Sequence, residues 1–343
     1  MSGRQAGRPG GRQGGAGALV HVAVGVIYNQ RGEVLVARRP AHVHQGGLWE
    51  FPGGKVEPGE GRWQALQREL REELDIEPTA GRPLIEVLHA YPEYRVRLDV
   101  WAVQAFCGEP RGREGQALRW LPVARLTAEQ FPAANRAIIN AVRLPTVYAV
   151  SAEPGDDPAG YLRALEVLLT AGVQLVQLRA KTLDEGAYRT LARQALALCR
   201  ARGAALLLNG PPEWAAALGA DGVHLTSARL MAAPSRPLGP DKWVAASCHT
   251  AEEVAHACRI GVDFIVVSPV LPTGTHPGRA ALGWAGLKAL TAVSTVPVFA
   301  LGGLSPEDRR SAYEQGAQGV AGISSLWGRA GAGEAWGMDR EKG

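Results

Sequence analysis

The 343-residue sequence predicts a chain of two α/β domains, an α/β/α sandwich followed by a (β/α)8 barrel. Its first part contains strand-like apolar runs that are separated by turn signals and that flank one strongly patterned helix. Its second part contains eight short apolar runs that alternate with helical stretches, which is the pattern of a closed parallel barrel. The length agrees with two domains, because one domain usually takes about 100–200 residues.

Composition and charge exclude several other classes of protein. Hydrophobic residues make up 46% of the chain, yet no run of about 18 apolar residues exists, so we expect no membrane span. The net charge of +4 would suit an anionic substrate, and we expect no strong binding of nucleic acids. Residues 1–17 are rich in glycine and arginine and lack an apolar segment, which predicts a disordered basic tail rather than a secretion signal. The four cysteines are scattered and form no Cys-x-x-Cys pair, which indicates neither zinc nor disulfides and favours a reducing, cytoplasmic location.

The first domain is expected at residues 18–144. Its apolar runs and turn residues predict the order strand, turn, strand, glycine-rich loop and helix. The first two strands are expected at His21–Tyr28 and Glu33–Arg38, and the loop at Val43–Glu50. Beyond the helix, we expect strands at Leu84–Tyr91, Arg95–Phe106 and Trp120–Pro122 and a final helix at Phe131–Val142.

One helix of this domain carries three glutamates on a single face. Glu69, Glu72 and Glu73 follow the spacing i, i+3 and i+4, while Trp63, Leu66, Leu70 and Leu74 form the neighbouring apolar face. Carboxylates so close together raise one another's pKa unless a cation lies among them, and oxygen ligands suit Mg²⁺ or Mn²⁺. The alternative is a solvated acidic face whose charges pair with Arg68 and Arg71.

The full spacing around these glutamates resembles the Nudix box. It reads Gly54-x5-Glu60-x7-Arg68-Glu69-Leu70-x-Glu72-Glu73. The resemblance implies that Glu69, Glu72 and Glu73 bind Mg²⁺, with Mn²⁺ as the other candidate, and that Arg68 holds one of them in place. Gly53 in the glycine loop is a further expected ligand through its backbone. Where the family has a glycine after the helix, this chain has Asp75, for which we expect a left-handed and slightly strained C-cap.

Motifs outside the box narrow the resemblance to the MutT branch of this family. They are Ala23-Val-Gly25, Arg38-Arg39, Glu50-Phe-Pro-Gly-Gly-Lys55, Gly108-Glu-Pro110, Glu114-Gly-Gln116 and Phe131-Pro-x-Ala-Asn135. The resemblance implies hydrolysis of 8-oxo-dGTP to a nucleoside monophosphate and pyrophosphate. Such an activity removes an oxidised nucleotide before it causes replication errors.

The same resemblance assigns roles to individual residues. Arg39 and Asn135 match residues that contact the oxidised purine, and Glu50 and Phe51 belong to the expected substrate-binding set. An amide suits this task because it offers donors and an acceptor, and 8-oxoguanine carries a donor at N7 where guanine carries an acceptor. Read from the residues alone, Asn135 could instead cap its helix and Arg39 could form a surface ion pair. Glu114 matches a loop acid that is a metal ligand or a general base, so Glu69 or Glu114 would take the proton of the attacking water.

The second domain is expected at residues 146–328, followed by a disordered tail at 329–343. Its strands are predicted at Val147–Val150, Leu175–Leu178, Ala205–Leu208, Gly222–Leu225, Val244–Ser247, Phe264–Val267, Val298–Leu301 and Gly319–Ile323. Functional groups of such a barrel lie where its strands end. The polar side chains at those positions are Gln177, Arg179, Lys181, Asn209, Ser247, His249 and Ser268. A phosphate cradle of backbone N–H groups is predicted at Gly302, Gly303, Gly322 and Ser324.

Motifs throughout this domain resemble the thiamine phosphate synthase and thiazole tautomerase family. They are Gln177-Leu-Arg-x-Lys181, Ala220-Asp-Gly-Val-His-Leu225, Ser247-x-His-Thr-x-Glu-Glu253, Ser268-Pro-Val-x-Pro-Thr273, Ala300-Leu-Gly-Gly303 and Gly319-Val-Ala-Gly322. Where the synthases carry two acidic Mg²⁺ ligands, this chain has Gly210 and the acid-free stretch Thr226–Arg229, and His276 replaces a phosphate-binding lysine. We therefore expect no synthase activity, because the pyrophosphate leaving group lacks its metal.

Two interpretations of the barrel stay open at this point. A tautomerase acting on a thiazole phosphate needs proton transfer, for which His249 is the candidate acid and base. The alternative is a non-catalytic barrel that senses a ligand or serves as a scaffold.

Overall fold

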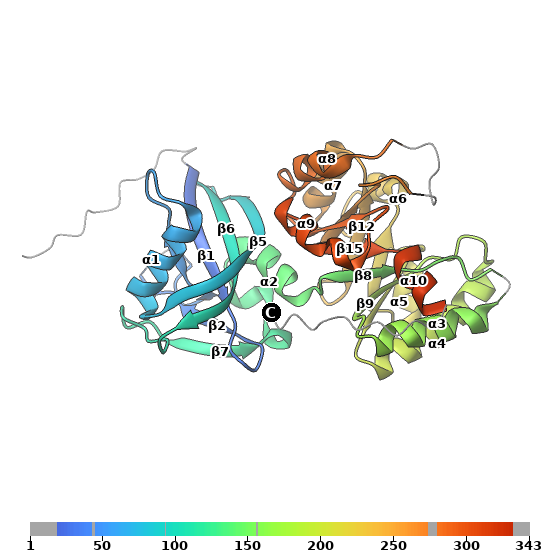
Figure 1. Ribbon diagram of the computed structural model, residues 1–343, viewed down its shortest axis with the longest axis horizontal. Coiled ribbons are helices and arrows are strands. Elements are labelled where there is room, and N and C mark those ends of the chain that lie inside the picture. Colours follow the sequence, from blue (N-terminus) through green and yellow to red (C-terminus); the bar gives the residue numbers. More distant parts are fainter. Residues whose placement is uncertain (1–18, 43–44, 93, 156, 274–279, 332–343) are drawn as a thin grey trace, which may run out of the picture.

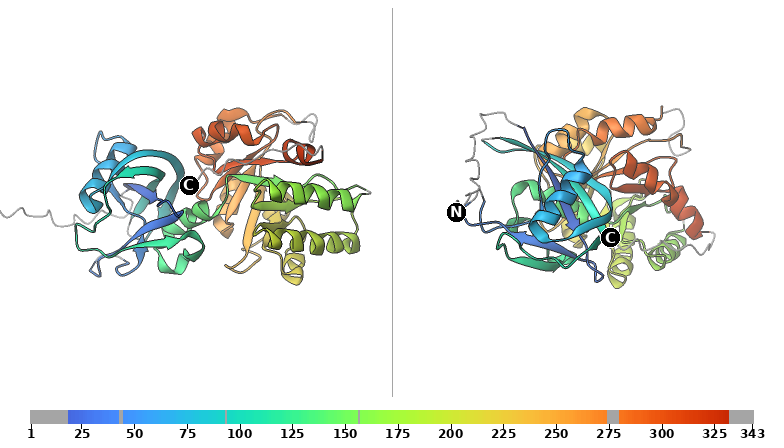
Figure 2. Two further views of the ribbon diagram at one scale, coloured as in Figure 1. Left: turned by 60° about the horizontal axis from the view of Figure 1, so that its bottom comes forward. Right: turned by 60° about the vertical axis from the view of Figure 1, so that its left-hand side comes forward.

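The computed structural model describes residues 19–42, 45–92, 94–155, 157–273 and 280–331. The predicted basic tail, His276 and residues 332–343 lie outside these ranges. The two domains lie side by side along the long axis of the molecule, with helix α2 (Arg136–Arg143) between them (Figures 1 and 2). Among the described helices, none is both long and apolar enough to span a membrane.

The first domain consists of two β-sheets and two α-helices, with short 3₁₀ turns. One sheet has the strand order β4-β1-β6-β5 and the other has the order β3-β2-β7. Helix α1 (Arg62–Leu74) buries Leu66 and Leu70 on one side, whereas α2 packs Ile138 and Ile139 into the core on the other side. This arrangement confirms the predicted α/β/α sandwich. The strands are β1 (Leu19–Ile27), β2 (Glu33–Arg38), β3 (Trp49–Glu50), β4 (Gly53–Lys55), β5 (Glu77–Ala90), β6 (Arg95–Cys107) and β7 (Leu118–Pro122).

Strand β5 differs most from its prediction, since it begins at Glu77 rather than at Leu84. Pro78, Gly81 and Pro83 lie in this added stretch and disfavour a strand in the sequence pattern. The structure accommodates them through three register irregularities against β6. Long-range pairing therefore overrides the local preference of these residues.

The second domain is a closed barrel whose strands run in the order β8 to β15 around the ring. Six of its eight strands have the predicted bounds, whereas β12 is longer by one residue at each end and β15 is shorter by one residue. The strands are β8 (Val147–Val150), β9 (Leu175–Leu178), β10 (Ala205–Leu208), β11 (Gly222–Leu225), β12 (Trp243–Cys248), β13 (Phe264–Val267), β14 (Val298–Leu301) and β15 (Gly319–Gly322). The surrounding helices are α3 (Pro158–Thr170), α4 (Glu185–Ala201), α5 (Pro212–Leu218), α6 (Ser227–Ala232), α7 (Ala251–Ile260), α8 (Gly283–Thr291), α9 (Arg309–Glu314) and α10 (Ser324–Gly331). Because α10 continues to Gly331, the prediction that the disordered tail begins at residue 329 is wrong.

The end of α2 closes the barrel at the side where its strands begin. Leu144 is 5% exposed and belongs to the same buried cluster as Tyr148, Phe264 and Phe299 in the barrel interior. The side-chain amide of Gln318, which precedes β15, donates to the carbonyls of Ala141 (2.9 Å) and Leu144 (3.2 Å). The two domains are therefore joined by a packed junction, and the mouth of the barrel, where its strands end, faces away from that junction.

Candidate functional site

Helix α1 presents the three glutamates with unequal exposure. Leu66, Leu70 and Leu74 of this helix are fully buried, which fixes the rotation of the helix against the sheet. On the other side, the Glu69 side chain is 15% exposed and that of Glu72 is 62% exposed. The glutamates thus share a face as predicted, but only part of that face is shielded from solvent.

Arg68 ties the glycine loop to this helix. Its guanidinium donates to both carboxylate oxygens of Glu60 (2.9 Å each), to Glu69 (2.8 Å) and to the carbonyl of Lys55 (2.9 Å). The bond from Arg68 holds the pKa of the Glu60 carboxyl below its ordinary value. A planar guanidinium that contacts two carboxylates and one carbonyl fixes their relative positions. This geometry suits the orienting role that the sequence suggests for Arg68.

Three carboxyl groups act on Glu73. Burial first, and then the charges of Glu69, Glu114 and Glu50, raise the pKa of Glu73 to about 8, while the backbone N–H of Gly53 donates to it and opposes the rise. Gly53 was expected to bind the metal through its backbone. In the structure, its backbone N–H donates to Glu73. So much negative charge in a half-buried place fits a divalent cation with oxygen ligands.

The acids still stand apart from one another. In the described ranges, no three carboxylate, imidazole or thiol groups are gathered closely enough to hold a metal ion. Gly54 packs against Glu69, because a Cβ built on Gly54 would lie 2.1 Å from the Glu69 carboxyl carbon. A cation would therefore need side-chain rotations of the acids, which the half-exposed face of α1 allows.

The loop that carries Glu114 is fastened to the end of α1. The backbone N–H of Arg113 (3.0 Å) and the side-chain amide of Gln116 (3.2 Å) both donate to the carbonyl of Glu73. Arg113 also forms an ion pair with Asp75 (2.9 Å), whose φ of 61° and ψ of 31° confirm the predicted left-handed C-cap. Glu114 is thereby held near the acidic face, although its side chain remains exposed.

Arg39 and Glu50 form an ion pair beside the acids. Both side chains are half-buried, and burial raises the pKa of Glu50 while Arg39 opposes that rise. Tyr91 lies close by. Its hydroxyl accepts a hydrogen bond from the N–H of Ala134, and the charge of Arg39 acts to lower the pKa of this hydroxyl. The predicted substrate residues Arg39 and Glu50 are thus brought together with the segment that precedes Asn135.

Asn135 is 8% exposed and ends the 3₁₀ turn η3 (Ala133–Asn135). It occupies the N-cap position of α2, but its side chain makes no capping hydrogen bond, so the capping alternative is not supported. Phe51, another expected substrate residue, is 4% exposed and stacks on Phe131 with ring centroids 5.4 Å apart. Its ring belongs to the core beneath the site rather than to an open surface.

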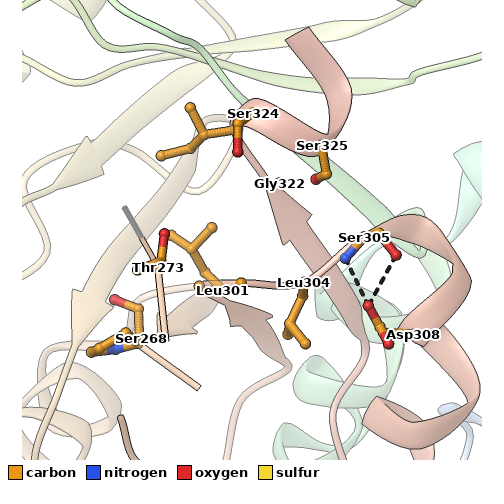
Figure 3. Close-up of a pocket in the computed structure, with 13 residues that line it drawn as sticks. Ser268, Thr273, Leu301, Leu304, Ser305, Asp308, Gly322, Ser324 and Ser325 are labelled. Atoms are coloured by element: carbon orange, nitrogen blue, oxygen red, sulfur yellow. Dashed lines mark hydrogen bonds between the residues drawn. The ribbon is translucent and has the colours of Figure 1, made fainter. Parts of the chain in front are cut away.

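A cavity of about 370 Å³ lies at the mouth of the barrel, after strands β13, β14 and β15. Gly302 (φ 106°) and Gly303 (φ 65°) line it in conformations that side chains rarely adopt. Figure 3 shows Ser324 and Ser325 at the start of α10, across the cavity from Ser268. The Ser325 hydroxyl is buried and has no hydrogen-bond partner within the described residues. An orphaned donor beside a glycine turn and a helix start is suited to a phosphate.

The predicted barrel residue Gln177 belongs to a buried polar chain. Its amide donates to the Tyr148 hydroxyl (3.2 Å), which contacts Nδ1 of His224 (3.2 Å), and Nε2 of His224 contacts the Ser247 hydroxyl (2.8 Å). Burial lowers the pKa of His224 to about 3, so this imidazole is neutral. The sequence analysis did not single out Tyr148 and His224 as site residues; polar groups inside otherwise apolar strands were the available signal.

Arg179 and Lys181 are held by an acid that the sequence analysis missed. Glu153 pairs with the Arg179 guanidinium (3.1 Å) and accepts from the backbone N–H of Lys181 (2.8 Å). Asn209, also at the mouth, donates to the carbonyl of His224 (3.0 Å). These residues therefore stand at one end of the barrel as predicted, but several already have protein partners.

His249 is half-buried next to the cavity. Its Nδ1 donates to the carbonyl of Ser268 (2.6 Å), and its backbone N–H donates to Glu253. Because a carbonyl only accepts, this contact places the proton on Nδ1 and leaves Nε2 as an acceptor in the neutral ring. That tautomer can take a proton at Nε2.

The structure explains why the barrel lacks one acid. A Cβ built on Gly210 would lie 2.9 Å from the Trp214 ring, so the indole fills the place of a side chain there. Trp214 is in turn packed against Tyr188 at 5.1 Å. In the second acid-free stretch, the Thr226 hydroxyl caps α6 by accepting from the N–H of Arg229 (3.3 Å).

Comparison with known proteins assigns both domains. Residues 23–141 match the family model described as NUDIX domain, and residues 147–326 match that of thiamine monophosphate synthase. The 8-oxo-dGTP diphosphatase of Escherichia coli (strain K12) is 39% identical over 120 residues, which cover 35% of this chain and 93% of that protein. "Putative thiamine-phosphate synthase 2" of Aquifex aeolicus is 36% identical over 183 residues, which cover 53% of this chain and 98% of that protein.

A solved structure from a study of MutT from Aliivibrio salmonicida and Vibrio cholerae is 40% identical, with a TM-score of 0.32, and the match covers 36% of this chain and 96% of that one. The chain belongs to the thiamine monophosphate synthase family through its barrel and to the Nudix family through its first domain.

Proposed function

We propose that the first domain is a Mg²⁺-dependent pyrophosphohydrolase that converts 8-oxo-dGTP to its monophosphate and pyrophosphate, and so removes an oxidised nucleotide from the pool used in replication. The observation that carries this proposal is the convergence of Glu50, Glu69 and Glu114 on Glu73. The similarity to an 8-oxo-dGTP diphosphatase over nearly the whole of that protein supports the choice of substrate.

In this proposal, Glu69, Glu72, Glu73 and Glu114 hold the cation, and Mn²⁺ is an alternative to Mg²⁺. When bound, the cation supplies charge neutralisation at the triphosphate oxygens and lowers the pKa of the attacking water. Arg68 fixes the position of the Glu69 carboxylate through its bond of 2.8 Å. Glu69 or Glu114 accepts the proton from the water, and the pH–rate profiles of the two Gln variants distinguish them.

The proposed purine site consists of Arg39, Glu50 and Asn135, with the core ring of Phe51 supporting it from below. Asn135 is suited to read the base because its amide makes no capping bond and is almost completely buried. An amide acceptor aimed at N7 pairs with the N7–H of 8-oxoguanine and is left unpaired by guanine. Discrimination then comes from the cost of an unsatisfied buried polar group.

A product assay tests this proposal. The full-length protein is incubated with 8-oxo-dGTP, dGTP and the other common nucleotides, each with and without Mg²⁺. We expect the monophosphate and pyrophosphate from 8-oxo-dGTP at the highest kcat/KM, and no turnover in the presence of a chelator. Equal kcat/KM for 8-oxo-dGTP and dGTP would contradict the proposed substrate preference. Release of inorganic phosphate alone would contradict the proposed reaction.

For the barrel, we propose binding of a thiazole phosphate, with tautomerisation as its chemistry. The cavity beside Gly302, Gly303 and Gly322, with Ser324 and the orphaned hydroxyl of Ser325, supports phosphate binding. The tautomer of His249 leaves an acceptor at Nε2 for proton transfer. Arg179, Lys181 and Asn209 follow the ends of strands β9 and β10, and Gln177 and Ser247 belong to the buried polar chain below them. Thiamine phosphate synthesis is not proposed, because Trp214 occupies the place of an acid at Gly210.

Two measurements on the full-length protein test the barrel. We expect calorimetry to detect thiazole phosphate, and NMR to detect its isomerisation, with His249→Ala binding the ligand but losing the isomerisation. We expect no thiamine phosphate from the pyrimidine pyrophosphate and thiazole phosphate. Binding without isomerisation in the unmodified protein would favour the ligand-sensing alternative, and thiamine phosphate formation would contradict the argument from Gly210.

A further inference from the structure

A cleft of about 1010 Å³ lies at the junction of the two domains, apart from both sites described above. Its walls include the β1–β2 turn and strand β5 from the first domain, the end of α2, and the end of α3 and the start of α9 from the barrel. Among the described residues that line it, none is acidic. Five of them are arginines, namely Arg31, Arg82, Arg143, Arg202 and Arg309.

Most of these guanidinium charges lack a carboxylate partner among the residues that the structure describes. Arg82 lies over the ring of Tyr313 (4.4 Å) and Arg143 over that of Trp243 (5.2 Å). Arg309 donates to the carbonyl of Pro306 (2.9 Å). Within the described part of the chain, the side chain of Arg31 has no partner.

Arg202 is the one arginine of this set that approaches an acid, again counting the described residues only. It lies 3.6 Å from Glu166, and both side chains are largely exposed. An exposed pair at that distance is weak and is screened by salt. The cleft therefore keeps a strong excess of positive charge.

A concave surface with charges of one sign concentrates its electric field and attracts counter-ions. Guanidinium groups match phosphate oxygens in pairs, which makes several arginines around one cavity a phosphate-binding arrangement. The Tyr28 hydroxyl also lines the cleft, and burial raises its pKa to about 12, so it stays protonated and can donate. The volume is close to the upper end of small-molecule sites, which run to about 1,000 Å³.

We propose that this interdomain cleft is a second anion site and binds a small polyphosphate compound of the nucleoside di- or triphosphate class. Such a ligand contacts both domains at once, since Arg31 and Arg82 belong to the first and Arg202 and Arg309 to the barrel. A small ligand is favoured over a nucleic acid because the arginines surround one cleft, while the whole chain carries a net charge of only +4.

Calorimetric titration of the full-length protein with inorganic tripolyphosphate tests the proposal. A chelator is present, so that no cation recruits the probe to the acids of the first domain. The test variant is Arg31→Gln combined with Arg202→Gln, because both side chains are exposed and removing them leaves the cores intact. We expect at least about tenfold weaker binding in this variant, as two charge-assisted contacts are lost.

Matched controls separate site binding from general charge effects. Arg163→Gln removes an exposed arginine of α3 that does not line the cleft, and should leave the affinity unchanged. Arg31→Lys combined with Arg202→Lys retains the charges and should restore most of the binding. Arg31→Gln alone keeps the test valid if the double variant does not fold.

Three outcomes would overturn the proposal. The first is the same dissociation constant and stoichiometry in the unmodified protein and in the double Gln variant. The second is an equal loss of affinity in Arg163→Gln, which would indicate general charge attraction. The third is tighter binding of a single-stranded oligonucleotide of about 12 nucleotides, lost in the double Gln variant, which would assign the cleft to nucleic acid.

Discussion

In the first domain, the charges of three carboxyl groups act on Glu73, whereas the mouth of the barrel offers glycine turns and serine hydroxyls. Among the described residues that line the barrel cavity, the one carboxyl is that of Asp308, which accepts from the N–H (2.8 Å) and hydroxyl (2.9 Å) of Ser305. The site around Glu73 therefore has an excess of negative charge, whereas the acid of the barrel cavity is hydrogen-bonded to a neighbouring serine.

This difference indicates two ways of handling a phosphate group. Converging carboxylates repel a phosphate unless a cation lies between them, so the hydrolysis proposed for the first site would need a metal. Backbone N–H groups and hydroxyls bind a phosphate directly, so the phosphate binding proposed for the barrel would not. Trp214 reinforces the contrast, because it fills the space beside Gly210 where an acid would stand.

The largest effect is expected when an acid of the first site is neutralised. Glu73→Gln keeps the shape of the side chain but removes its charge, and we expect kcat for 8-oxo-dGTP to fall by at least about a hundredfold. Glu57→Gln, an exposed loop residue of the same domain, is the matched control and should keep full activity. If folded Glu73→Gln protein turns over within a few-fold of the unmodified protein, the proposed dependence of the first site on its acids is contradicted.

A smaller effect is expected for recognition of the purine base. Asn135→Ala should lower the ratio of kcat/KM for 8-oxo-dGTP over dGTP by about 5- to 150-fold, since one buried hydrogen bond contributes roughly 1–3 kcal/mol when its loss leaves a group unpaired. The absence of a capping bond means that helix stability should change little. An unchanged ratio, measured by competition between the two nucleotides, would mean that Asn135 does not contact the purine.

The sequence contained most of the fold and part of the sites. Fixed spacings and apolar periods predicted α1 and the barrel strands because those elements depend on local pattern. Glu153 and Tyr148 were missed because their importance comes from partners distant in the chain, Arg179 and His224. The packed junction at Leu144 was also hidden, since a Leu-Pro pair between two patterns has the composition of an ordinary linker.

The stability of the barrel should respond to pH through His224. Its pKa falls from an ordinary value of 6.5 to about 3 in the folded protein, so the folded state binds fewer protons than the unfolded state in that window. The free energy of unfolding is therefore unaffected above pH 6.5 and falls as pH drops below it, by up to about 1.4 kcal/mol per pH unit. Urea unfolding between pH 5 and 7 should show a shallower slope in His224→Asn; an equal slope in both proteins would contradict the burial argument.

The smallest effect concerns the end of α1. Asp75 has a positive φ of 61°, and Asp75→Gly should raise the free energy of unfolding by about 0.5 kcal/mol, because the relief of backbone strain exceeds the loss of the exposed pair with Arg113. Hydrolysis should stay unchanged, since the bonds from the Arg113 N–H and the Gln116 amide to the Glu73 carbonyl still hold the Glu114 loop when the ion pair is lost. Asp75→Asn removes the ion pair but keeps the positive φ. If Asp75→Gly lowers the free energy of unfolding as much as Asp75→Asn does, the ion pair outweighs the strain.

The proposed functions place divalent metal in the first domain and not in the barrel. Mn²⁺ binding, measured by electron paramagnetic resonance on the full-length protein, tests this placement directly. We predict that Glu69→Gln combined with Glu73→Gln removes the bound Mn²⁺ signal, while Asp308→Asn, which neutralises the carboxyl of the barrel cavity, leaves it intact. Mn²⁺ binding that survives the double variant, or that disappears in Asp308→Asn, would contradict the account.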